Sequence, residues 1–300
     1  MSRVTRTAVV QLCATPDVAT NLATTAQLVR RAHTAGAEVI LLPEAFTFLG
    51  PESTKIEILE PLPDSVPNGA EHPAFTPGPI LRHCQRLAQE TGSHLILGGF
   101  HESAPVAGRS RNTCVHLDPE GRIRALYRKI HLFDVSLADG TQLRESARTE
   151  PGGEIVTTEL PFGVLGLSIC YDIRFPYLYQ ALVDRGAVAL TAPSAFTATT
   201  GAAHWEVLLR ARAIECQSYM LAPAQHGHHW GTRKSWGHSM IIDPWGRIVA
   251  ECREGDGIAV ADIDPDEVTR VRQQLPSLEH RRKLTPAGAE RAGDFRKADA

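Results

Sequence analysis

Short apolar segments of strand length recur throughout this sequence of 300 residues and alternate with segments of helical periodicity. Turn-forming residues bound most of the apolar segments, as is typical of β-strands. Strands are predicted at 7–12, 38–42, 94–98, 112–117, 122–128, 163–169, 187–192, 219–223, 238–242, 248–252 and 258–263, and helices at 20–35, 80–90, 177–185, 204–216 and 265–274. This alternation predicts an α/β fold with helices outside and sheets inside.

Composition stays even along the chain, which argues against a linker between two independently folded halves. We therefore predict a single domain over residues 1–284. The charged, Ala/Gly-rich stretch 285–300 is predicted to be a tail that is loosely ordered or lies over another subunit. The stretch 50–78, rich in Pro, Asp, Glu and Ser, is predicted to be an exposed insertion near a pocket.

Charge and hydropathy narrow the possible partners. The 31 basic and 34 acidic residues give a net charge of -3 and are spread along the chain, so no basic stripe favours nucleic acid or a membrane surface. No apolar run approaches the roughly 20 residues that span a bilayer. The first residues lack the apolar stretch and cleavage site of a signal peptide. We expect a cytoplasmic protein with neither nucleic acid nor membrane as partner.

Six cysteines are scattered along the chain without a Cys-x-x-Cys pair, and we expect reduced, mostly buried thiols. Cys170 differs from the others because it follows the predicted strand 163–169 and precedes a predicted helix. Open α/β sheets place ligand sites at the carboxyl ends of strands, and backbone N–H groups before a helix can lower a thiol pKa and stabilise an oxyanion. Cys170 is therefore a candidate nucleophile, although a buried packing role is the alternative for most free cysteines.

Three charged residues lie in settings that allow either a functional or a structural role. Glu44 follows an apolar strand and Pro43, where a carboxylate is either part of a site or a solvated turn residue. Lys129 ends the strand-like run 122–128 and is either a pocket charge or a surface cation. Glu145 lies in a polar loop, where a solvated carboxylate is the usual interpretation.

Together these residues form a pattern. The segments Leu-Leu-Pro-Glu-Ala-Phe at 41–46, Tyr-Arg-Lys-Ile-His-Leu-Phe at 127–133 and Leu-Ser-Ile-Cys-Tyr-Asp-Ile-Arg-Phe-Pro at 167–176 resemble the three signature segments of the nitrilase superfamily of carbon–nitrogen hydrolases. Their order and intervals also match, so the joint resemblance is far more specific than any single segment. It extends over about residues 7–284, and only the stretch 50–78 departs from it by its greater length.

The resemblance implies an α-β-β-α four-layer sandwich and a homodimer or higher homo-oligomer. It also implies that Cys170 is the nucleophile, Glu44 the general base, Lys129 the oxyanion-stabilising cation and Glu145 a supporting glutamate. Such a scheme needs no metal and no other cofactor. The dense histidine cluster at 226–229 lacks the carboxylate or cysteine partners of a metal site.

The segments 193–201 and 204–215 are most similar to the Nit subgroup, which implies hydrolysis of deaminated glutathione, an amide with an α-keto acid end. The ω-amidases, which cleave α-ketoglutaramate and α-ketosuccinamate, are the nearest alternative, followed by hydrolases of N-carbamoyl amino acids or other linear amides. Arg174 and Tyr171 are candidate substrate-binding residues because a guanidinium beside the thiol can grip the keto-acid carboxylate. An ion pair between Arg174 and Asp172 is the structural alternative.

Rival functions fit the sequence less well. Nitrilases usually carry Trp-Glu after their cysteine, whereas Tyr171 and Asp172 follow Cys170 here. A cysteine peptidase of the papain type would require a histidine partner. A non-catalytic scaffold on the same fold is possible in principle, but the retention of all four residues argues against it.

Overall fold

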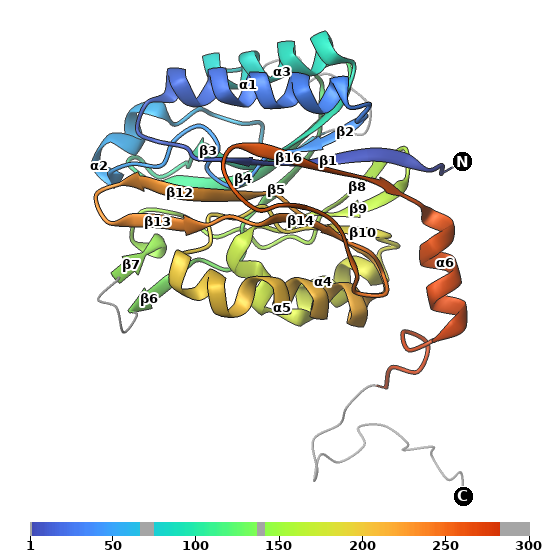
Figure 1. Cartoon of the computed structure of the whole chain (residues 1–300). Coiled ribbons are helices and arrows are strands. Elements are labelled where there is room, and N and C mark those ends of the chain that lie inside the picture. The colour runs from blue at the N-terminus through green and yellow to red at the C-terminus, as the bar shows by residue number, and fades with distance from the viewer. Residues whose placement is uncertain (1, 67–74, 137–141, 283–300) are drawn as a thin grey trace, which may run out of the picture.

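The computed structural model describes residues 2–66, 75–136 and 142–282. Two β-sheets lie face to face in the middle of the molecule, and helices cover both outer faces (Figure 1). Helices α1 (Val18–Thr34) and α3 (Pro79–Thr91) cover one sheet, whereas α4 (Pro176–Asp184) and α5 (Ala198–Cys216) cover the other. The predicted four-layer α-β-β-α sandwich is confirmed.

The first sheet has eight strands in the described part of the chain, in the order β13-β12-β1-β2-β3-β4-β5 with β16 paired to β1. Its strands are β1 (Thr5–Leu12), β2 (Val39–Leu41), β3 (His94–Ser103), β4 (Ser110–Leu117), β5 (Ile123–Arg128), β12 (Ala224–Trp230), β13 (Arg233–Trp236) and β16 (Gly257–Ile263). The pairings β1–β2 and β2–β3 are parallel, so the carboxyl ends of β1, β2 and β3 meet at one edge.

The second sheet has six strands among the described residues, in the order β15-β14-β11-β10-β9-β8. Its strands are β8 (Thr157–Leu160), β9 (Gly163–Gly166), β10 (Ala189–Thr191), β11 (Tyr219–Ala222), β14 (Ser239–Ile242) and β15 (Ile248–Cys252). Outside these sheets, β6 (Asp134–Ser136) pairs in antiparallel fashion with β7 (Gln142–Arg144), and α6 (Pro265–Gln274) follows β16. A short helix, α2 (Glu52–Lys55), and the 3₁₀ segment Ile56–Ile58 precede α3.

The alternation of side chains along β1 explains the two cores. Val9 belongs to the cluster between the two sheets, where it shares a core with Leu190 of β10. Its neighbours Ala8 and Val10 point the other way and pack with Val29 of α1. Successive strand residues point to opposite faces of a sheet, so one fully buried apolar run serves both layers.

The elements with strong apolar patterns are confirmed to within a few residues, and five strands were not predicted. The missed strands are β6, β7, β8, β12 and β13. The segment Ala224–Trp230 is rich in histidine and lacks the alternation that identifies a strand. Helix α5 begins at Ala198 rather than 204 because Thr197 caps it, and the strand predicted at 163–169 ends at Gly166.

Two predicted segments lie partly or wholly outside the described residues. The stretch 50–78 contains α2, but residues 67–74 lie outside the described part. The predicted tail at 285–300 also lies outside the described residues. Across the ranges that the structure does describe, no helix combines the length and apolar character needed to cross a membrane.

Candidate active site

A cavity of about 170 Å³ is lined by residues that follow the carboxyl ends of β2, β5 and β9. Its floor carries Glu44, Lys129, Glu145 and Cys170, which come from four separate segments of the chain. Glu44 follows β2, Lys129 follows β5, and Glu145 begins the 3₁₀ turn Glu145–Ala147. The structure therefore brings all four sequence-predicted residues to one place. The rim includes Lys55 of α2, Arg144 of β7 and Arg233 of β13, which confirms that the stretch 50–78 reaches the pocket.

Lys129 lies between the two glutamates and is almost fully buried. Its Nζ is 3.0 Å from Glu44 Oε1 and 2.9 Å from Glu145 Oε2. Burial by itself lowers the pKa of a lysine, but the carboxylates of Glu145 and Glu44 hold the pKa of Lys129 well above its ordinary value. Lys129 is therefore a permanent cation at neutral pH.

Glu44 is held as an anion by contacts on both of its carboxylate oxygens. Asn112 Nδ2 donates to Oε1 at 2.8 Å, and the backbone N–H of Ala195 donates to Oε2 at 2.8 Å. Burial raises the pKa of Glu44, but Lys129, the thiol of Cys170 and the N–H of Ala195 together outweigh burial and lower the pKa to about 2. Glu44 is thus ionised and able to accept a proton, and its thiol neighbour Cys170 hydrogen-bonds to it.

Glu145 and Glu44 are linked by the same amide. Asn112 Nδ2 also lies 3.3 Å from Glu145 Oε1, and the backbone N–H of Phe133 donates to Glu145 Oε2 at 2.7 Å. Gly99 of β3 lies beneath this network, since a Cβ there would come within 2.9 Å of both Glu44 and Asn112. Only glycine allows the strand to approach so closely.

Cys170 begins the 3₁₀ segment Cys170–Arg174 with a φ of 49°, in the left-handed region that few non-glycine residues adopt. Its backbone N–H donates to Pro193 O at 3.0 Å. Such strain is typical of side chains that are held for a function. The predicted lowering of the thiol pKa by a helix N-terminus is wrong, because burial and Glu44 raise the pKa of Cys170 and α4 begins only at Pro176. The resting thiol is neutral and needs a base.

Asp172 fixes the turn that carries the cysteine. Its carboxylate accepts hydrogen bonds from Ile169 N at 2.8 Å, Tyr127 Oη at 2.7 Å and His131 Nδ1 at 2.7 Å. The predicted alternative of an Arg174–Asp172 ion pair is wrong, because no such pair forms among the described residues and these donors occupy the carboxylate. Asp172 therefore joins the second sheet to the end of β5.

Arg174 and Tyr171 line a second, smaller pocket beside the thiol. The guanidinium of Arg174 lies 5.3 Å from the ring centre of Phe196 and 5.9 Å from that of Tyr171. Its Nη2 lies 3.3 Å from His204 Nδ1. This pocket is lined by Phe133, Cys170, Tyr171, Arg174, Ala195, Phe196, Thr197 and Thr200. The pocket measures about 10 Å³, so a substrate group bound at Cys170 reaches Arg174 only by widening it.

Some functional groups of the cavity were missed by the sequence reasoning. Asn112 carries an unusual polar amide within the strand that pairs with β5, and this polarity was the available signal. The N–H of Ala195 belongs to the backbone and leaves no trace in the sequence. Arg233 lies in the unpredicted strand β13.

The histidine cluster is occupied by other contacts. His226 Nε2 pairs with Asp256 at 2.8 Å, His228 Nε2 contacts Gly231 O at 2.6 Å, and the two ring nitrogens of His229 contact Ala14 O and Ser235 Oγ. No group of three or more His, Cys, Asp or Glu side chains suited to a metal is found within the described ranges.

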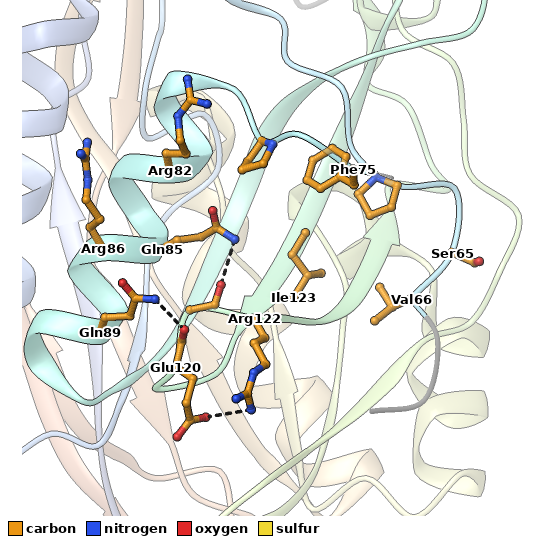
Figure 2. A pocket seen from close by; sticks show the side chains of 13 residues that line it. Ser65, Val66, Phe75, Arg82, Gln85, Arg86, Gln89, Glu120, Arg122 and Ile123 are labelled. Atoms are coloured by element: carbon orange, nitrogen blue, oxygen red, sulfur yellow. Dashed lines mark hydrogen bonds and ion pairs between the residues drawn. The ribbon is translucent and has the colours of Figure 1, made fainter. Parts of the chain in front are cut away.

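A larger cavity of about 350 Å³ lies elsewhere, between α3 and the turn before β5 (Figure 2). Gln85 Nε2 donates to Gly121 O at 2.9 Å and Gln89 Nε2 donates to Glu120 O at 2.8 Å, so its glutamines hold the turn in place. None of the four clustered residues lines it. Size alone is therefore a poor guide to the candidate site, because the clustered titratable residues lie in the cavity of about 170 Å³.

Comparison with known proteins agrees with this geometry. The family model for carbon-nitrogen hydrolases matches residues 6–273. Deaminated glutathione amidase of Bos taurus is 45% identical over 281 residues, which is 92% of this chain and 81% of that protein. Deaminated glutathione amidase of Synechocystis sp. (strain PCC 6803 / GT-S) is 43% identical over 277 residues, 91% of this chain and 97% of that protein. The crystal structure of Saccharomyces cerevisiae Nit3, a member of branch 10 of the nitrilase superfamily, has a TM-score of 0.80 at 30% identity and covers 92% of this chain and 96% of that chain.

Proposed function

The chain belongs to the carbon-nitrogen hydrolase family, and from this premise we propose that it hydrolyses deaminated glutathione through a thioester on Cys170. The observation that carries the proposal is the cluster of Glu44, Lys129 and Glu145 around a strained, buried thiol. A carboxylate replaces the histidine of other cysteine hydrolases as the base.

Attack begins when Glu44 accepts the thiol proton of Cys170 and the sulfur bonds to the amide carbon. Two contacts to carboxylates occupy Lys129, and an ammonium group has a third N–H for the developing oxyanion. Each such donor contributes about 3–4 kcal/mol in comparable sites. Because Lys129 is already charged and buried, it needs no reorganisation when the oxyanion forms.

Collapse of this intermediate breaks the C–N bond, and Glu44 gives its proton to the departing amine. A water then attacks the thioester while Glu44 takes its proton. The acid product leaves as the proton returns to the sulfur, so the enzyme is restored. Glu145 contributes by fixing Lys129, and Asn112 contributes by donating to both Glu44 and Glu145.

Arg174 supports the α-keto acid part of the proposal. It lies in the pocket beside Cys170, its guanidinium is positioned over the rings of Tyr171 and Phe196, and it has no carboxylate partner among the described residues. A guanidinium in this position can bind the carboxylate of a keto acid bidentately. The ω-amides α-ketoglutaramate and α-ketosuccinamate share that carboxylate and are the alternative substrates.

The proposal is tested by comparing kcat/KM for deaminated glutathione, α-ketoglutaramate and glutathione, which carries an α-amino group in place of the keto group. Turnover of the keto substrates and not of glutathione is expected. Arg174→Met, which keeps the apolar stem over the rings, should lower kcat/KM for both keto substrates about 10- to 100-fold. Arg185→Met, at the residue that follows α4, is the control. No turnover of a keto-acid amide would contradict the proposal, and full activity of Arg174→Met would remove Arg174 from it.

We also propose a homodimer in the cytoplasm. Val207 and Ile214 lie seven residues apart on α5 and are 68% and 50% exposed, which supports a covered face on this helix. Light scattering of the wild type should give the mass of a dimer, and Val207→Glu should give a monomer. A monomeric wild type would contradict the proposal. Cell fractionation tests the location.

A further inference from the structure

We propose that Arg233 binds a carboxylate on the amine half of the substrate, so that the site is built for amides whose leaving amine is itself an acid. This inference rests on the proposed function and extends it to the other side of the scissile bond. In deaminated glutathione the leaving amine is cysteinylglycine, which ends in a carboxylate, whereas α-ketoglutaramate releases only ammonia.

Two pockets meet at the thiol. Three residues line both the pocket that contains Arg174 and the cavity of about 170 Å³ that contains Arg233. They are Cys170, Phe133 and Ala195. A substrate amide at the sulfur can therefore extend in two directions, into the cavity of about 170 Å³ as it stands and into the pocket of about 10 Å³ by widening that pocket. The cavity leads to Arg233, and the pocket leads to Arg174.

The position of Glu44 decides which half of the substrate lies where. Glu44 lines the cavity that contains Arg233 and not the pocket that contains Arg174. Because Glu44 must hand its proton to the departing nitrogen, the amine half has to extend into the cavity of about 170 Å³. The keto-acid half then extends toward Arg174.

Arg233 carries an unsatisfied group at this cavity. Its Nη2 donates to Ala195 O at 3.0 Å, but its Nη1 is buried and has no hydrogen-bond partner in the described structure. It also forms no ion pair with any described carboxylate. A buried guanidinium nitrogen without an acceptor is costly, and a substrate carboxylate would satisfy it.

The charge around the cavity directs an anion to Arg233. Lys129 lies between Glu44 and Glu145, so the floor carries a net charge of about -1, which disfavours a second carboxylate near the thiol. At the rim, Lys55, Arg144 and Arg233 face the single anion Glu52, which contacts Lys55 at 3.4 Å. An acidic amine is therefore repelled from the floor and attracted to the rim.

The scaffold holds Arg233 in place. It begins β13, which pairs with β12 through Trp230 and Arg233, and Trp236 N donates to Phe196 O at 3.0 Å. The hairpin is thus tied to the segment that carries Ala195, whose N–H holds Glu44. Figure 1 shows this hairpin at the same end of the molecule as α2 and β7, which supply the other rim cations. A fixed cation at a set distance from the base favours leaving groups of one length.

The test compares deaminated glutathione with its C-terminal carboxamide, which differs only in the charge of the leaving amine. The ratio of the two kcat/KM values should favour the carboxylate about 10- to 100-fold in the wild type. In Arg233→Met this ratio should fall to near one, chiefly through KM. Lys234→Met, on the neighbouring residue of the same hairpin, should keep the wild-type ratio. Arg233 also contacts Ala195, whose N–H holds Glu44, so the substitution can lower activity on both substrates. Such a general loss lowers both kcat/KM values alike and leaves their ratio unchanged.

A second experiment measures how strongly cysteinylglycine inhibits the hydrolysis of α-ketoglutaramate. Competitive inhibition should weaken about 10- to 100-fold in Arg233→Met. A ratio and an inhibition constant unchanged by Arg233→Met would overturn the inference and leave the proposed function intact. A wild type that hydrolyses α-ketoglutaramate but not deaminated glutathione would also overturn it. A wild type inactive on every keto-acid amide would instead overturn the proposed function.

Discussion

Arg128 and Lys129 are consecutive residues at the end of β5, and each forms a buried cluster with glutamate, but the two clusters differ in what remains available. Arg128 grips Glu102 with two parallel contacts, Nε to Oε2 at 2.9 Å and Nη2 to Oε1 at 2.7 Å. Its remaining donors reach Pro63 O and Asp64 O. Every group of this cluster is satisfied, so it joins the insertion to the sheet and leaves no group for chemistry.

Lys129 is shared instead of paired. Its ammonium contacts both Glu44 and Glu145, and the same cluster contains a neutral thiol in a strained conformation. Planar guanidinium suits a closed bidentate pair, whereas a compact ammonium group can contact several groups and still donate to a new one. We infer that the Arg128 cluster serves stability and the Lys129 cluster serves catalysis.

Matched substitutions of the two glutamates should separate these roles most strongly. Glu44→Gln keeps the shape and the contacts to Asn112 and Ala195 but removes the base, so kcat/KM should fall about 10²- to 10⁴-fold. Glu102→Gln should leave kcat unchanged for the folded enzyme. Steady-state kinetics on purified variants measure both. Retention of more than a tenth of wild-type kcat/KM by Glu44→Gln would break the distinction.

The reverse effect is expected for stability at Arg128. Arg128→Met leaves the buried carboxylate of Glu102 without its main cation, which should lower the free energy of unfolding by about 3–5 kcal/mol. Chemical denaturation measures the loss, and Arg124→Met, an exposed arginine on the same strand, should change it by less than about 0.5 kcal/mol. If Arg128→Met instead lowered kcat with unchanged stability, the Arg128 cluster would belong to the site.

The pH dependence of stability should distinguish Glu44. Its pKa is lowered to about 2 in the folded protein by Lys129 and its hydrogen bonds, against about 4.3 for an unfolded glutamate. A lowered pKa gives stability that is present above the unfolded value and is lost as pH falls toward the folded value. Between pH 5 and pH 2 the wild type should therefore lose on the order of 3 kcal/mol that Glu44→Gln does not lose. Equal acid dependence of unfolding in the two proteins would contradict this.

The smallest expected effect concerns strain. With φ at 49°, Cys170 favours glycine, so Cys170→Gly should be about 1 kcal/mol more stable than Cys170→Ala. At Cys114, in the middle of β4, the order should reverse and glycine should be about 0.5–1 kcal/mol less stable than alanine. Thermal unfolding of the four variants compares the two sites. The same order at both cysteines would mean that the active site stores no strain.

Regular patterns made much of the fold predictable. The apolar runs at β1, β2 and β10 and the periodic helices α1 and α6 could be identified because burial imposes their periodicity. Strands β12 and β13 could not, since neighbours across the sheet and not their own residues place them there. Arg233 was missed for that reason.

The proposed catalytic residues were predictable only where their own side chains lie in recognisable segments. Glu44, Lys129, Glu145 and Cys170 stand in recognisable segments, but the contact of Glu44 with Ala195 N joins residues 151 positions apart. The raised pKa of Cys170 also depends on burial between two sheets and on Glu44. The position of Cys170 before a helix therefore predicted a lowered thiol pKa, whereas the pKa is raised.

Rapid quenching of the wild type with deaminated glutathione, followed by mass spectrometry of its peptides, tests the role of Cys170 most directly. A thioester of the keto-acid half should appear on the peptide that contains Cys170, reach a steady level during turnover and be absent from Cys170→Ala, which should be inactive. An adduct on another of the six cysteines, or turnover by Cys170→Ala, would contradict a nucleophilic Cys170 served by Glu44 and Lys129.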